Sequence, residues 1–332
     1  RGDHMVKIQD IARQMGLSTS TVYKAFNGGA DINKNTRAEI LKVAARMGYI
    51  GKPKNFPHKR VCVFLERMEL QQVTYYLYEI ALAFKRAAAQ HGFEVVIRSL
   101  GDDVLGYDQI MRQYCLQGAL ILGLNTADQY YKQLERLEHP TVLVDNYIEN
   151  PNISCISADN MRGMTLVVQH LLSLGHQRIG FINGEENSST SAERLNGYVS
   201  AITLGGLRYT PTLTQHGDFS EESGARCAHA LVEQGVTALL CASDLMAIGA
   251  IRQLQQMGLR VPEDISVCGF DDIRLSRYIT PGLTTVRIDV DSVGTRAFLC
   301  LQDLIAGGPC VKILEAPQLI VRQSTAAART GR

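Results

Sequence analysis

Residues 19–27 place hydroxyl, amide and ammonium groups repeatedly on one face of a predicted helix. Steps of one, three and four residues bring these groups together, whereas Val22, Ala25 and Phe26 fall on the opposite face. Hydrogen-bonding groups on one face and apolar groups on the other suit a helix that reads base edges in the major groove of DNA. We expect DNA contacts from Thr19, Ser20, Thr21, Tyr23, Lys24 and Asn27.

The neighbouring sequence supplies the elements that would position this helix. Ala12 allows a close helix contact, Gly16 suits a tight turn, and Ser18 suits the N-cap of the second helix. Asn33 suits the N-cap of a third helix. The segment therefore predicts a helix-turn-helix with a supporting helix, against the alternative of an ordinary three-helix surface module.

The charge of the chain is divided between its two parts. Residues 6–60 contain eleven Lys and Arg and three acids, a net charge of +8, whereas residues 61–332 contain twenty-two and twenty-nine, a net charge of −7. The near-neutral total of +1 therefore hides a basic head on an acidic body. A basic region that coincides with a helix-turn-helix indicates binding to DNA phosphates.

Length and composition limit the class of protein. The 332 residues suit a small head and a larger body, and residues 1–5 resemble a cloning remnant. No signal peptide or long apolar run is found, so we expect a cytoplasmic protein without membrane contact. The eight cysteines and eight histidines show no ligand spacing, so we expect neither a metal site nor a cofactor.

The body alternates apolar strand patterns with amphipathic helix patterns. We expect strands at 61–65, 94–98, 119–122, 141–144, 178–182, 238–241 and 266–270. We expect helices near 73–91, 106–116, 128–137, 160–174, 190–205, 221–234 and 244–257. This order predicts two α/β subdomains with doubly wound parallel sheets, the second beginning at 153–159, and a ligand in the cleft between the carboxyl ends of their strands.

Many sequence segments, in the same order along the chain, resemble the LacI/GalR family of bacterial transcription regulators over nearly the whole chain. In the head they include Ile8-Gln-Asp-Ile-Ala-Arg-Gln-Met-Gly-Leu-Ser, and in the body Ser173-Leu-Gly-His-Gln-Arg-Ile-Gly-Phe-Ile, Ala242-Ser-Asp-Leu-Met-Ala-Ile-Gly-Ala and Val261-Pro-Glu-Asp-Ile-Ser-Val-Cys-Gly-Phe-Asp-Asp. The resemblance implies a periplasmic-binding-protein-like body, a homodimer, a palindromic operator and a small-molecule effector.

The same resemblance, read together with strand ends, gives candidate effector-binding residues. Asp145 ends a strand, Arg194 and Asp271 match ligand-binding positions of the family, Phe219 matches an aromatic position beside the ligand, and Ser243 stands where Asn is frequent. Residues after the first strand vary with ligand in the family, and here they include Glu66, Arg67, Tyr75 and Tyr76. Two carboxylates and a guanidinium suit a polyol. For Asp145 and Asp271 the alternative is turn capping, and for the tyrosines it is surface or dimer packing.

The segment that joins head and body departs from the family. The family has a hinge helix with a leucine wedge there, but Gly51, Pro53 and Pro57 oppose a helix. Phe56 is a possible substitute wedge, although a packed or exposed linker aromatic is the commoner role. We expect an extended linker whose Lys52 and Lys54 contact phosphates, with Lys59 and Arg60 as further candidates.

These observations give a domain plan and a function. The plan has a tag remnant (1–5), a helix-turn-helix domain (6–49), an atypical linker (50–60) and an effector-binding and dimerisation domain (61–332). Subdomain one spans about 61–157 and 288–317, and subdomain two about 158–287 and 318–330. We expect a transcriptional regulator, most simply a repressor, that responds to a sugar or sugar derivative. The alternatives are a nucleoside- or purine-responsive regulator, a free sugar-binding protein and an enzyme.

Overall fold

The computed structural model describes residues 6–27, 32–47, 49, 59–65, 75–99, 107–127 and 131–329. Several residues with predicted roles lie outside this part of the chain. They are Lys52, Lys54, Phe56, Glu66, Arg67 and the side chain of Asn27.

The head consists of α1 (Ile8–Met15), α2 (Thr19–Asn27) and α3 (Lys34–Arg46). Ser18 caps α2 as predicted, because its Oγ accepts a hydrogen bond from the backbone N–H of Thr21 at 3.0 Å. Lys7 precedes α1, and its backbone N–H donates to the Asp10 carboxylate at 2.8 Å. The apolar side chains that face inward from the three helices form a small core of their own, comprising Ile11, Ala12, Val22, Ala25, Ile40 and Ala44.

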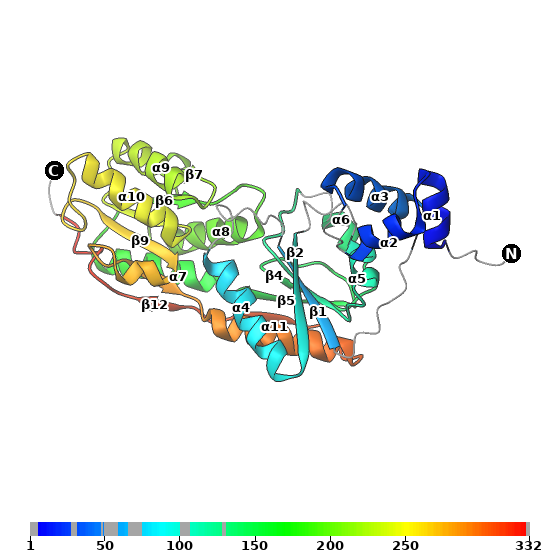
Figure 1. Ribbon diagram of the computed structural model, residues 1–332. Coiled ribbons are helices and arrows are strands. Elements are labelled where there is room, and N and C mark those ends of the chain that lie inside the picture. The colour runs from blue at the N-terminus through cyan, green and yellow to red at the C-terminus, as the bar shows by residue number, and fades with distance from the viewer. Residues whose placement is uncertain are drawn as a thin grey trace.

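The first sheet of the body has the strand order β11-β5-β4-β3-β1-β2, and its neighbouring strands are parallel. Its strands are β1 (Lys59–Leu65), β2 (Phe93–Ser99), β3 (Ala119–Leu122), β4 (Thr141–Val144), β5 (Ile153–Ala158) and β11 (Lys312–Glu315). Its helices are α4 (Tyr75–Gln90), α5 (Tyr107–Gln113), α6 (Tyr131–Leu134) and α11 (Val290–Ile305). Helices α4 and α11 pack side by side (Figure 1).

The second sheet has the order β12-β10-β9-β8-β6-β7 and is parallel except for the pairing of β10 with β12. Its strands are β6 (Ile179–Asn183), β7 (Thr214–His216), β8 (Ala238–Cys241), β9 (Ser266–Asp271), β10 (Thr284–Arg287) and β12 (Gln318–Ile320). Its helices are α7 (Asn160–Ser173), α8 (Ser189–Leu204), α9 (Glu221–Glu233) and α10 (Asp244–Gln256), with short 3-10 turns at Pro211–Leu213 and Arg274–Arg277.

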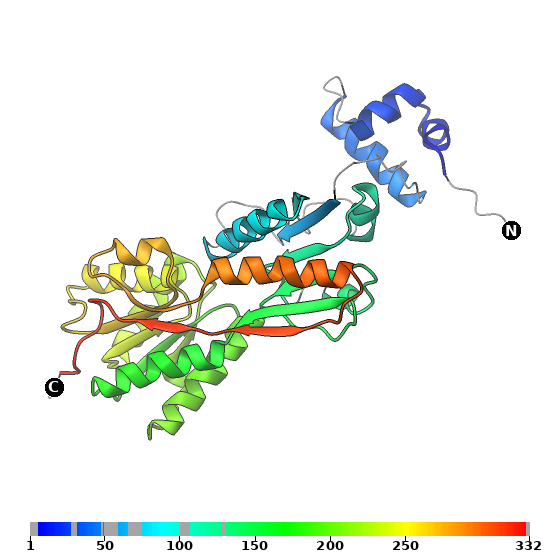
Figure 2. The same cartoon turned by 90° about the horizontal axis from the view of Figure 1, so that it is seen from below.

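The chain passes between the two sheets at three places, after β5, after β10 and between β11 and β12. In Figure 2 the last of these crossings runs as an extended segment from one lobe to the other. Two of the crossings touch, because the N–H of Asp159 donates to the carbonyl of Glu315 at 2.9 Å. The two lobes are therefore joined by a bundle of crossovers on one side of the cleft, which is the geometry of a hinge.

Two expectations from the sequence need correction. Residues 153–159 do not begin the second half, because β5 completes the first sheet between β4 and β11, and the second sheet starts with β6. Arg60 is not available for phosphates. It lies buried in β1, which begins two residues earlier than expected, and its Nε is 3.0 Å from a carboxylate oxygen of Glu94.

No helix within the described ranges combines the length and the apolar character needed to cross a bilayer. Across the same ranges, no cluster of His, Cys, Asp and Glu has the arrangement of a metal site.

Candidate functional site

A cavity of about 460 Å³ lies where the carboxyl ends of the strands of both sheets face each other. The first sheet contributes Leu65 from the end of β1 and Asp145 after β4, and the second contributes Ser243 after β8 and Asp271 from the end of β9. This is the location at which open α/β sheets bind ligands, and the volume lies in the usual range of small-molecule sites.

The structure brings most of the predicted pocket residues together. The lining includes Asp145, Arg194, Phe219, Ser243 and Asp271. Ser243 also caps α10, because its Oγ accepts a hydrogen bond from the N–H of Met246 at 3.3 Å.

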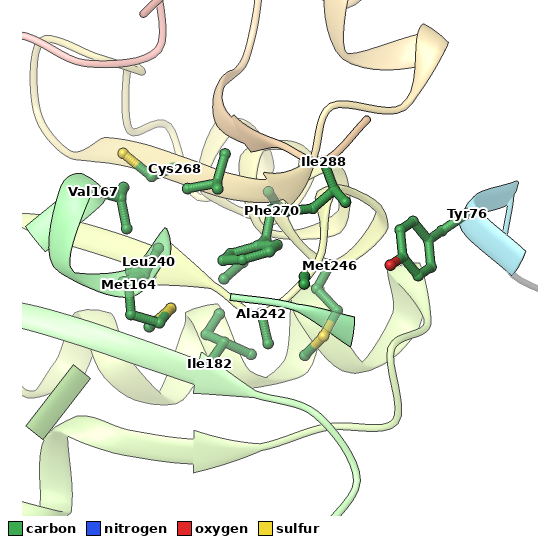
Figure 3. Close-up of a cluster of buried hydrophobic side chains, with 14 of the residues drawn as sticks. Tyr76, Met164, Val167, Ile182, Leu240, Ala242, Met246, Cys268, Phe270 and Ile288 are labelled. Atoms are coloured by element: carbon green, nitrogen blue, oxygen red, sulfur yellow. The ribbon is translucent and has the colours of Figure 1, made fainter. Parts of the chain in front are cut away.

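Tyr75 lies outside the described cavity lining, and its neighbour Tyr76 takes a place in the cavity wall. Tyr75 is 60% exposed, whereas Tyr76 is buried and lines the cavity. Successive residues of a helix point about 100° apart, and Tyr76 shares the buried face of α4 with Ile80 and Phe84. In Figure 3 the Tyr76 ring reaches from α4 toward the buried cluster around Phe270.

Arg194 is the buried cation at the centre of the site. It projects from α8, its Nε donates to Asn160 Oδ1 at 2.9 Å, and its Nη1 donates to the carbonyl of Ala242. Its Nη2 is 3.4 Å from Asp271 Oδ1, and its guanidinium carbon lies 3.8 Å from the centroid of the Phe270 ring. Hydrogen bonds and a cation–π contact on every side fix the guanidinium before any ligand arrives.

Burial disfavours the ionised form of the carboxyl groups around Arg194. Burial raises the pKa of Asp145 to about 6 and the pKa of Asp271 to about 7, although Arg194 acts in the opposite direction on both. Behind them, burial and then the charge of Asp271 raise the pKa of Asp244 to about 8. One guanidinium thus faces more carboxyl groups than it can neutralise.

Two buried polar atoms at the cavity make no hydrogen bond of normal geometry with any described residue. They are Asp145 Oδ1 and the hydroxyl oxygen of Tyr76, and the two side chains lie close enough for each to influence the pKa of the other. Burial, followed by the charge of Asp145, raises the pKa of Tyr76, so the hydroxyl stays protonated and can donate. A buried polar atom without a partner costs free energy, and such atoms at a cavity wall suit a ligand that donates and accepts hydrogen bonds.

Backbone strain also collects at this site. Of the five non-glycine residues with positive φ in the described ranges, Asp145 (59°), Phe219 (64°) and Asp271 (109°) line the cavity, and Asp272 (53°) follows directly. Such conformations persist where the surrounding structure imposes them, typically at functional sites. Gly184 leaves room for the Phe219 ring, since a Cβ there would lie 2.0 Å from the ring.

Sequence reasoning missed several polar residues of the cavity. They are Asn125, Asn146, Glu185, Ser188, Thr190, Asp218 and Ser220. Asn125, Asn146 and Glu185 each lie within three residues of the end of a strand, which was the available signal. Asp218 follows the three-residue strand β7, which has no apolar run to reveal it.

On the head, the predicted reading face of α2 is open to solvent. Thr19, Ser20, Tyr23 and Lys24 are exposed, whereas Val22 and Ala25 are buried. Thr21 is only half-buried, and its hydroxyl lies 2.8 Å from that of Ser18, so it takes part in the cap. The exposed face therefore presents hydroxyl groups, a phenol and an ammonium group.

Comparisons with known proteins cover both parts of the chain. Residues 7–52 match the model for bacterial regulatory proteins of the lacI family, and residues 168–325 match a periplasmic binding protein-like domain. The chain is 33% identical to the HTH-type transcriptional regulator MalR of Streptomyces coelicolor over 97% of both chains. It is 30% identical to the HTH-type transcriptional repressor CytR of Escherichia coli K12 over 96% of both.

Solved structures agree with these relatives. A complex of the transcriptional regulator CelR with cellobiose matches with a TM-score of 0.73 and 27% identity over 96% of this chain and 99% of that one. The Lac repressor dimer bound to operator matches with a TM-score of 0.70 and 26% identity over 97% and 100%.

Proposed function

Because the chain belongs to the LacI family of bacterial transcriptional regulators, we propose that it binds a palindromic operator as a homodimer and that a sugar-type effector in the interlobe cavity controls this binding. DNA-binding regulation is the function of its relatives by name, and none of those reported above is an enzyme. The class of effector is then argued from the residues of the cavity.

One observation carries the proposal for a polyol. A fixed guanidinium, two raised-pKa carboxyl groups and a phenol that makes no hydrogen bond of normal geometry with a described residue converge from both lobes on the same cavity. Each hydroxyl of a sugar donates one hydrogen bond and accepts others, so a sugar can satisfy Arg194, Asp145 and Tyr76 at once. Phe219 adds an apolar surface for the carbon face of a ring.

A nucleoside is the second candidate, because the Phe219 ring at the cavity wall is also suited to stacking against a base. A nucleoside carries a ribose that the same polar groups can bind. A base needs the aromatic ring of Phe219 for stacking, whereas the carbon face of a plain sugar can pack against any apolar side chain. Phe219→Leu should therefore reduce nucleoside binding much more than sugar binding.

The test pairs a thermal-shift screen of sugars, sugar phosphates and nucleosides with operator binding by mobility shift. A ligand selective for the native state at a hundredfold excess over Kd stabilises it by about 2.7 kcal/mol. Arg194→Lys keeps the charge but loses the fork of donors, so it should lose the ligand response and still bind DNA. An unchanged response would remove Arg194 from the site, and failure to bind any upstream DNA would refute the regulatory function.

A further inference from the structure

The described cavity lining has an excess of negative charge. Four carboxyl groups, those of Asp145, Glu185, Asp218 and Asp271, share the wall with a single described cation, Arg194. Arg194 is already committed to Asn160, Ala242 and Asp271. A phosphate or carboxylate on the ligand would therefore approach several carboxyl groups, and the one cation of the described lining already pairs with Asp271. The described wall thus favours an uncharged ligand.

The carboxyl groups fall into two zones that differ in solvent contact. Asp145 and Asp271 are largely withdrawn from solvent beside Arg194, whereas Glu185 and Asp218 are exposed. Both exposed side chains belong to loops that follow strands of the second sheet, β6 and β7. The cavity therefore has an inner polar zone around Arg194 and an outer polar zone around Glu185 and Asp218.

The outer zone is held in place by neighbouring groups. Glu185 Oε2 accepts a hydrogen bond from Asn125 Nδ2 at 3.2 Å, which fixes it across the cavity mouth. Asp218 Oδ1 accepts from the backbone N–H of Ser220 at 3.0 Å and from its hydroxyl. Partial burial acts to raise the pKa of Asp218, but hydrogen bonds from Ser220 and Ser223 outweigh it and hold the pKa below its usual value. The Asp218 carboxylate is therefore an ionised acceptor. These ordered acceptors are placed to receive hydrogen bonds from a ligand that extends outward.

The cavity is larger than a single sugar ring requires. A volume of 460 Å³ falls in the range of roughly 300–1,000 Å³ that is typical of pockets for drug-sized ligands, whereas one hexose has only a dozen or so non-hydrogen atoms. One hexose therefore leaves a substantial part of the cavity unfilled. A second ring, partly in solvent at the mouth, would use this space.

We propose that the effector is an uncharged saccharide of at least two rings, with one ring bound around Arg194 and the next bound by Glu185 and Asp218. This inference rests on the proposed function and adds the length and charge of the ligand. Glu185 is then the residue that distinguishes a two-ring from a one-ring sugar, because it contacts only the outer ring.

Isothermal titration of the full-length protein tests this with cellobiose and maltose as two-ring probes, glucose and ribose as one-ring probes, and glucose 6-phosphate as the anionic probe. We expect a two-ring probe to bind at least tenfold more tightly than its one-ring component, and the phosphate to bind least. Glu185→Gln should weaken the two-ring probe about tenfold, as expected for loss of a hydrogen bond to a charged group, and leave the one-ring probe unchanged. Glu186→Gln, exposed and outside the lining, is the matched control.

Three results would overturn the proposal: tighter binding of the phosphate, equal binding of one-ring and two-ring probes, or no saccharide binding by a protein that still binds operator. Equal weakening of both probe lengths by Glu185→Gln would also overturn the assignment of Glu185 to an outer ring. The regulatory function is judged separately by operator binding, so its failure is distinguishable from failure of the saccharide assignment.

Discussion

Some residues of the cavity wall lower the stability of the folded protein while providing polar groups for a ligand. Asp145 carries a raised pKa, a buried oxygen without a hydrogen bond of normal geometry among the described residues, and a left-handed backbone, all at one position. A polar side chain chosen for stability alone would avoid each of these costs. Several unfavourable features at one residue are expected where the surrounding fold holds that residue in place for a ligand.

Replacing Asp145 by Asn should stabilise the unliganded protein at alkaline pH. Burial raises the folded-state pKa of Asp145 from 3.8 to about 6, so the native state holds the proton more tightly than the unfolded state. The contribution of Asp145 to stability is then most favourable below about pH 4 and is lost as the pH rises through 6. We expect Asp145→Asn to exceed the parent by about 1–3 kcal/mol at pH 8 and to match it near pH 4, by urea unfolding.

The same variant should bind effector poorly, because the amide removes one acceptor from the inner zone. Asp303→Asn, an exposed change on α11, is the control and should alter neither property. A lower stability of Asp145→Asn at pH 8 would mean that the ionised carboxylate is satisfied in the native protein, contrary to the contacts described.

Gly184→Ala should impair the site through Phe219. The added Cβ would meet the ring at 2.0 Å, so the aromatic side chain must move out of its position in the cavity wall. We expect a loss of about 1–3 kcal/mol in stability from overpacking and a clear loss of effector affinity by calorimetry. Combining Gly184→Ala with Phe219→Ala removes the clash and should restore the stability but not the affinity. If stability is not restored, the cost arises from the backbone at Gly184.

At the scale of elements, α2 separates its two faces sharply enough to assign functions to them. Lys24 is exposed on the open face, whereas Val22 and Ala25 are buried against the other helices of the head. Arg37 of α3 donates from Nε to the carbonyl of Ala25 at 2.9 Å and fixes the two helices together. This contact and the shared core hold α2 against the rest of the head.

Lys24→Ala should weaken specific DNA binding more than non-specific binding. An ammonium group on the reading face favours guanine O6 and N7, and loss of a good base contact costs about 1–3 kcal/mol of discrimination. Lys42, exposed on α3, is the matched control, since loss of a general positive charge should affect all sequences alike. Mobility shifts with operator and with scrambled DNA measure both effects. Equal losses on the two DNAs would show that Lys24 contacts only phosphate.

The sequence predicted elements best where burial sets the pattern. The apolar runs at 119–122, 141–144 and 238–241 are strands over the predicted residues, because both faces of a parallel sheet are covered. Strands β7, β10, β11 and β12 were missed, since they are only three or four residues long, and all but β10 are only partly buried. The helix α11 was not predicted either. The role of β5 was misread because a buried run does not reveal which sheet it joins.

The site was predictable where the family pattern or a strand end marked a residue, as for Asp271, Arg194 and Asp145. It was not predictable where rotation about a helix decides the direction of a side chain. Tyr75 and Tyr76 are the same residue type at adjacent positions, and only the buried neighbours on α4 place Tyr76 inward. The mouth residues Asn125 and Glu185 meet through contacts between distant segments, which no local pattern encodes.

At the scale of the whole molecule, the two lobes are joined by more than the three crossovers. Loops that follow strands of the two sheets also contact each other directly. The N–H and the hydroxyl of Thr126 donate to the carbonyl of Asn187 at 3.1 and 2.7 Å. The hydroxyl of Ser189 donates to Asn146 Oδ1 at 3.0 Å. An effector changes DNA affinity only if it favours one arrangement of the lobes over another, and breaking these loop contacts is how the arrangement would change.

A disulfide across these loops should therefore uncouple DNA binding from the effector. We propose Thr126→Cys with Asn187→Cys in a Cys310→Ser background, because Cys310 is exposed and would compete for oxidation. Oxidised protein prepared with and without effector should show the same operator affinity in mobility shifts, since the lobes can no longer separate. The reduced protein should retain the effector response of the parent. If effector still changes the operator affinity of the oxidised protein, the signal does not travel through separation of these loops, and a different movement of the lobes must carry it to the head.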